Sequence, residues 1–105
     1  MMVYFVGYLF RGPNRDLPEA EGERIQRGHL AYNRRQKLAG RYVLVGPFAD
    51  QEDPRGLIVM KAESIEAARE LMSADPAVRA GVLRVELRPW YGVKGITAMP
   101  PSGVE

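Results

Sequence analysis

The chain has 105 residues, a formal net charge of +2 and no cysteine. Its length suits one domain, and its composition, 46% hydrophobic and 27% charged, is that of a globular protein. The absence of cysteine excludes disulfides, a thiolate nucleophile and thiolate metal sites, and it fits a reducing compartment. The apolar start, residues 1–10, is too short to span a bilayer and lacks a signal-peptide pattern, so we expect a cytoplasmic protein with no membrane partner.

The first half of the chain reads as strand, helix and strand. Residues 2–10 are rich in β-branched and aromatic side chains and predict a strand. A helix is expected from about position 19 or 23 to position 39, with Gly40 as its left-handed C-terminal cap. A second strand over 41–48 follows, and then a polar loop over 50–55.

The second half reads as strand, helix and strand again. Residues 56–62 predict a strand, and Ser64 is a good N-cap for a helix over 65–72. A short helical turn is expected over 76–81, after an Asp-Pro break. Residues 82–91 alternate between charged and apolar side chains and predict the last strand.

This order, βαββαβ, predicts an α+β fold of the ferredoxin-like type, with an antiparallel sheet and two helices on one face. The first and third strands would be central, and both are apolar on both faces. Two helices cover one face only, so the other face needs a cover, and a second copy of the chain is the simplest one. We therefore expect a homodimer with its sheets face to face, a domain over 1–92 and a C-terminal tail over 93–105.

Basic residues gather between positions 24 and 37, on the first predicted helix. The first turn of that helix is acidic, so the charges complement the helix dipole. A nucleic-acid site would instead require a basic stripe interleaved with aromatic side chains. We interpret the cluster as a solvated face and expect no nucleic-acid partner.

His29 is the only histidine of the chain and lies in the apolar stripe of the first helix. Histidine is the side chain that titrates near neutral pH without strong perturbation, so His29 is the first candidate for proton transfer. From the residues alone, a core histidine bonded to a backbone carbonyl is the simpler interpretation.

Asp75 is the candidate partner of His29. A carboxylate that accepts the imidazole N–H would fix the tautomer of the ring, although an aspartate before proline also serves as a helix cap. Ser73 lies nearby and could donate a hydrogen bond to a substrate, or it could end the helix. One histidine and no cysteine argue against a metal site, and no phosphate-cradle motif is present, so no cofactor is expected.

Several short motifs resemble those of the YciI-like (YCII-related) family. The resemblance covers about residues 2–92 and rests on the following motifs: His29-Leu30-Ala31, Gly40-Arg41, Gly46-Pro47, the run from Ala74-Asp75-Pro76 to Gly81-Val82, and Arg88-Pro89-Trp90. It implies a ferredoxin-like domain that dimerises into an α+β barrel, with a site built on His29 and Asp75. Because of this resemblance we favour a functional site over a core histidine.

The sequence thus supports two hypotheses for function. The first is a small enzyme without cofactor or metal, an isomerase or a lyase of the dehydrochlorinase type, in which Asp75 orients His29 as general acid or base toward a small organic ligand. The alternative is a non-catalytic dimeric module that binds a small ligand or accompanies an enzyme. Candidate substrate-binding residues are Tyr4, Tyr8, Tyr32, Phe48 and Ser73.

Overall fold

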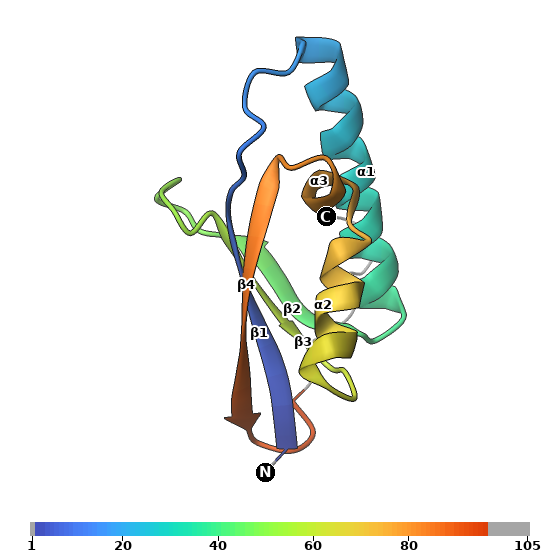
Figure 1. Ribbon diagram of the computed structural model, residues 1–105. Helices are drawn as coiled ribbons and strands as arrows, with labels where there is room; N and C mark the ends of the chain where they lie inside the picture. The colour runs from blue at the N-terminus through green and yellow to red at the C-terminus, as the bar shows by residue number, and fades with distance from the viewer. Residues whose placement is uncertain (1, 97–105) are drawn as a thin grey trace.

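The computed structural model describes residues 2–96. It contains four strands and three helices in the predicted order (Figure 1). The elements are β1 (Met2–Arg11), α1 (Glu19–Leu38), β2 (Tyr42–Pro47), β3 (Gly56–Met60), α2 (Ile65–Ser73), α3 (Pro76–Arg79) and β4 (Leu83–Gly92). No helix within this range is long and apolar enough to cross a membrane.

The strands form one antiparallel sheet in the order β2-β3-β1-β4, so the first and third strands are central as predicted. All three helices lie on one side of this sheet (Figure 1). The predicted α+β fold with helices on one face is therefore confirmed. Gly40 has a φ of 78° after α1, and the Ser64 side chain accepts a hydrogen bond from the Ala67 N–H at the start of α2, so both predicted caps are present.

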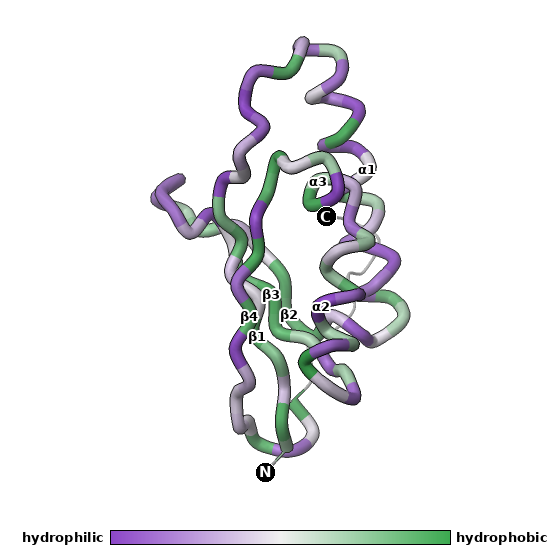
Figure 2. Tube along the Cα trace, viewed as in Figure 1, coloured by the Kyte–Doolittle hydropathy of each residue, from purple (hydrophilic) through white to green (hydrophobic). Residues whose placement is uncertain are grey.

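Successive side chains of a strand point to opposite faces of the sheet, so the apolar side chains form one layer on each face. Between sheet and helices lies a core that includes Phe5, Leu9, Ile58, Met60 and Met72. Polar residues gather after β1 and at the start of α1, whereas polar and apolar residues alternate along β4 (Figure 2).

The helix-free face of the sheet is also apolar on its central strands. Tyr4 and Val59 are buried there, and Ile96 packs against this cluster from the segment after β4. The Tyr4 hydroxyl lies 3.3 Å from the Ile96 backbone N–H, from which it accepts a hydrogen bond. The first residues of the predicted tail thus cover part of this face, while 97–105 lie outside the described residues. The boundary at residue 92 stays a prediction.

Candidate functional site

His29 lies on the side of α1 that faces the core. Ile25, His29, Tyr32 and Gln36 are its buried residues, a spacing that follows 3.6 residues per turn. His29 is 8% exposed and lies where α1 passes α3. This position places the ring at the margin of the core.

Asp75 joins α2 to α3 and is the N-cap of α3. Its Oδ1 accepts a hydrogen bond from the Ala77 N–H at 2.8 Å, and Pro76 occupies the first helical position, where no N–H is needed. The other carboxylate oxygen, Oδ2, lies 2.6 Å from His29 Nδ1. Asp75 is fully buried, so the predicted contact between the two side chains is present and shielded from water.

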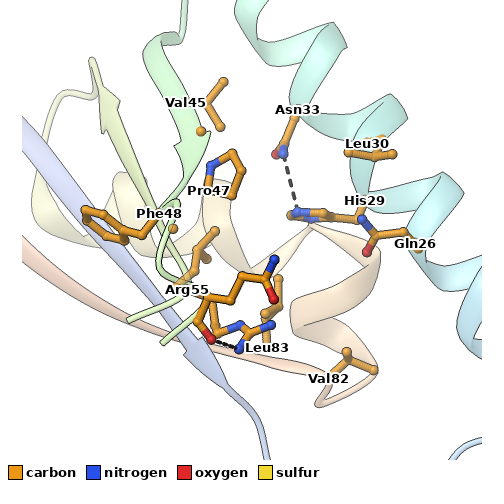
Figure 3. Close-up of a pocket in the computed structure, with 14 residues that line it drawn as sticks. Gln26, His29, Leu30, Asn33, Val45, Pro47, Phe48, Arg55, Val82 and Leu83 are labelled. Atoms are coloured by element: carbon orange, nitrogen blue, oxygen red, sulfur yellow. Dashed lines mark hydrogen bonds between the residues drawn. The ribbon is translucent and has the colours of Figure 1, made fainter. Parts of the chain in front are cut away.

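The contact fixes the orientation of the imidazole ring. A carboxylate only accepts hydrogen bonds, so the His29 Nδ1–H donates to Asp75 and Nε2 is left as the reactive nitrogen. Asn33, one helical turn later, has its Nδ2 atom 3.4 Å from Nε2 (Figure 3). The Asn33 Oδ1 atom is buried and has no hydrogen-bond partner among the described residues.

Nε2 faces a cavity of about 320 Å³ between α1, the start of β4 and the hairpin of β2 and β3 (Figure 3). A volume of this size suits a small organic molecule. The apolar lining side chains are Leu9, Leu30, Val45, Pro47, Phe48, Val82 and Leu83, and the polar ones are Gln26, His29, Asn33, Gln51 and Arg55. The cavity is thus mostly apolar with a few polar groups, as is typical of ligand sites.

Two tyrosines pack near Asp75 on the core side. Burial foremost, and then the negative charge of Asp75, raises the pKa of Tyr32, whose hydroxyl donates to the Leu71 carbonyl at 2.7 Å. The pKa of Tyr42 is also raised, first by burial and then by Tyr32 and Asp75. Both phenols are therefore neutral at physiological pH.

This arrangement can move protons between His29 and a molecule bound in the cavity. An imidazole oriented by a buried carboxylate can accept a proton at Nε2, and the carboxylate stabilises the imidazolium that forms.

Residues 2–96 contain no group of three or more potential metal-ligating side chains of the His, Cys, Asp and Glu types.

The predicted site residues are distributed unevenly around this cavity. His29 and Phe48 line it, with Asp75 directly behind the ring. Tyr32 points into the core and does not line the cavity. Ser73 is exposed at the end of α2 and lines a separate hollow beside β4.

Tyr4 and Tyr8 lie on the opposite side of the sheet from His29. Both pack in the cluster of the helix-free face, because even-numbered positions of β1 point away from the helices. The structure therefore does not bring them to the cavity of the same chain.

Four polar lining residues were not predicted from the sequence, namely Gln26, Asn33, Gln51 and Arg55. Gln26 and Asn33 lie three residues before and four residues after His29, so helical periodicity could have found them. Arg55 comes from the polar loop before β3, and no local pattern indicates that this loop folds toward α1.

Comparison with known proteins gives one curated relative and several solved structures. The uncharacterized protein YjpA of Bacillus subtilis (strain 168) is 33% identical over 63 residues, which are 60% of this chain and 72% of that protein. The structure of muconolactone isomerase matches with a TM-score of 0.69 and 14% identity, covering 95% of this chain and 100% of the other. A 5-chloro-2-hydroxyhydroquinone dehydrochlorinase (TftG) from Burkholderia phenoliruptrix AC1100, in complex with 2,5-dihydroxybenzoquinone, matches with a TM-score of 0.56 and 23% identity, covering 89% and 97%.

At these identities the two solved structures establish a shared α+β fold and no shared activity. The family model of the YCII-related domain matches residues 7–91, a range that contains His29, Asp75 and all the residues that line the cavity. This chain is therefore a member of the YCII-related domain family.

Proposed function

We propose that the protein is a small enzyme in which His29 and Asp75 act as a general acid–base pair on an organic substrate, with isomerisation or elimination as the reaction. The observation that carries this proposal is the buried 2.6 Å contact between Asp75 Oδ2 and His29 Nδ1 beside a cavity of about 320 Å³. The fold shared with an isomerase and a dehydrochlorinase supports it.

In the proposed reaction, His29 Nε2 removes a proton from a carbon made acidic by an adjacent carbonyl group. Asp75 stabilises the imidazolium through the Nδ1–H bond. The electron pair left on the substrate then either accepts the proton back at another carbon, which is isomerisation, or expels a leaving group, which is elimination. Such acid–base catalysis contributes about 10²- to 10⁴-fold to a rate.

The test is exchange of substrate hydrogen for solvent deuterium, followed by proton NMR. The first compounds to try are muconolactone and 5-chloro-2-hydroxyhydroquinone, the compounds after which the two structurally similar enzymes are named. We expect the wild-type protein to accelerate exchange or turnover, and His29→Gln to lower the rate by about 10²-fold or more. Arg69→Gln, at an exposed position of α2, is the matched control and should keep the wild-type rate. Equal rates for His29→Gln and wild type would refute the proposal.

A second candidate is a non-catalytic module that binds a small ligand. One contact favours it, because Asn33 Nδ2 lies 3.4 Å from the Nε2 atom that a base needs free. A compound that binds in the cavity without exchange or turnover, across a broad panel of enolisable compounds, would favour this candidate.

We also propose that a second copy of the chain packs on the helix-free face. Leu44 and Trp90 are each 45% exposed at the two edges of this face, and the apolar cluster of the central strands lies between them. Light scattering should give a mass of about twice 11.8 kDa. A monomer at micromolar concentration would contradict this interface.

A further inference from the structure

The backbone of Arg55, the residue just before β3, is held by two hydrogen bonds. Its N–H donates to the Leu9 carbonyl on β1, and its carbonyl accepts from the Phe48 N–H at 2.8 Å. These bonds close the hairpin loop onto the central strand. The side chain, half-buried, extends from this fixed point into the lining of the cavity, across from His29 (Figure 3).

The guanidinium of Arg55 has no carboxylate partner within residues 2–96. One of its nitrogens, Nη1, donates to the Gln51 carbonyl, while the group has five N–H donors in all. The acidic residues of the same loop, Asp50, Glu52 and Asp53, do not line the cavity, and Asp53 accepts instead from the Arg11 N–H. A partly desolvated cation with free donors therefore faces a space lined by no acid.

The opposite wall of the cavity contains a hydrogen-bond acceptor that has no donor. Asn33 lines the cavity beside His29, and its Oδ1 atom is buried and has no hydrogen-bond donor among residues 2–96. A buried acceptor left in this state costs free energy, and a ligand hydroxyl would remove the deficit. The apolar side chains of the lining favour a ligand with a hydrocarbon body.

We infer that the ligand of this cavity is an organic anion, whose anionic oxygen binds Arg55 and whose hydroxyl group donates to Asn33 Oδ1 beside His29. This inference rests on the proposed function, since it takes the cavity as the substrate site. Arg55 and Asn33 then set specificity, and His29 acts on the carbon skeleton held between them. The anionic oxygen can belong to a carboxylate or to a phenolate.

Binding of matched probes to the full-length protein tests this inference. 4-Hydroxybenzoate and 4-hydroxybenzamide have the same shape and differ in charge, and 4-nitrophenolate with 4-nitroanisole makes the corresponding phenolate pair. Chemical-shift titration should give each anion a Kd about 10-fold or more below that of its neutral partner, since charge-assisted hydrogen bonds are the stronger ones. The pair with the larger ratio identifies the type of anionic oxygen. Equal affinities, or no binding of any probe at about 10 mM, would overturn the inference.

Variants assign the preference to Arg55. Arg55→Gln should remove the preference for the anion, and Arg55→Lys should restore part of it, because a lysine keeps the charge without the planar fork. Arg69→Gln removes the same charge from an exposed site and should keep the wild-type ratio. Asn33→Leu should weaken binding of 4-hydroxybenzoate, relative to benzoate, by about 3- to 10-fold. An unchanged ratio in a folded Arg55→Gln protein would refute the role of Arg55.

The outcomes separate this inference from the proposed function. If His29→Gln keeps the preference for anions and the wild-type protein exchanges no substrate hydrogen, the catalytic proposal fails and the anion site stands. If exchange depends on His29 for neutral and anionic compounds alike, the anion site fails and the catalytic proposal stands.

Discussion

Replacing Asp75 by asparagine should reverse the tautomer of His29 while leaving the fold intact. The side-chain oxygen of asparagine can still cap α3 by accepting from the Ala77 N–H, as Asp75 Oδ1 does at 2.8 Å. Its amide NH₂ then faces His29 Nδ1, which must accept instead of donate. The ring proton moves to Nε2, and the lone pair that faces the cavity is lost.

The magnitude follows from the two hydrogen bonds of the carboxylate. Asp75→Ala loses the cap, worth about 1 kcal/mol, and leaves the buried His29 Nδ1–H unpaired, which costs about 1 to 3 kcal/mol. We therefore expect Asp75→Ala to lower the free energy of unfolding by about 2 to 4 kcal/mol, and Asp75→Asn by less, because it keeps the cap. Both variants should lower the rate of proton exchange by about 10²- to 10⁴-fold, since each removes the group that orients the base.

The assay combines long-range ¹H–¹⁵N NMR of the imidazole with denaturant unfolding. His29 is the only histidine, so its ring signals need no assignment. The wild-type protein should show the Nδ1–H tautomer and Asp75→Asn the Nε2–H tautomer. An Asp75→Asn protein that keeps the Nδ1–H tautomer, or the wild-type exchange rate, would refute this reasoning.

Three further predictions concern packing and pH. Gly28→Ala should leave the free energy of unfolding unchanged or lower it, because a Cβ there would lie 3.2 Å from Pro76 Cγ. Gly22→Ala, whose Cβ would lie in open space, should raise the free energy of unfolding by up to about 1 kcal/mol in urea. Equal gains for the two variants would contradict the close approach of α1 and α3. Burial raises the pKa of Tyr42 above its ordinary value of 10.0, so the unfolded chain loses this proton first and stability falls as the pH rises above 10.0. Tyr42→Phe should flatten that fall in melting temperature, and an unchanged alkaline slope would count against it. Ile96→Ala should lower the free energy of unfolding by about 1 to 3 kcal/mol, because Ile96 packs on the helix-free face of the sheet. Urea unfolding measures this change, and no loss of stability would show that the contact is dispensable.

The order of the elements could be predicted from the sequence because each element has its own local signal. The strands are runs of β-branched and aromatic residues, Ser64 caps α2 through its own side chain, and Gly40 takes the positive φ that ends α1. These signals act within a few residues and do not depend on the remainder of the fold.

The faces of β1 could not be assigned in the same way. This strand is apolar at odd and even positions alike, so a period of two cannot tell which set faces the helices. Tyr4 and Tyr8 were therefore predicted as cavity residues, although they lie on the face without helices.

The two halves of the site differ in how well they could be predicted. The helical spacing placed His29 on the inner stripe, but the tertiary packing of α1 against α3 brings Asp75 to it from 46 positions away. From the residues alone this pairing was one of two roles open to Asp75, beside that of a helix cap, and the family resemblance favoured it. Arg55 depends on how the loop before β3 closes onto Leu9, a long-range hydrogen bond with no local pattern.

Chemical rescue of His29→Ala tests the central claim, that the His29 imidazole is the base, most directly. The measurement is the rate of substrate deuterium exchange by this variant, with and without added imidazole. The account predicts a fall of about 10²- to 10⁴-fold and a partial recovery in proportion to the imidazole concentration, because free imidazole can occupy the space that the ring leaves beside Asp75. A His29→Ala protein that exchanges at the wild-type rate would contradict it.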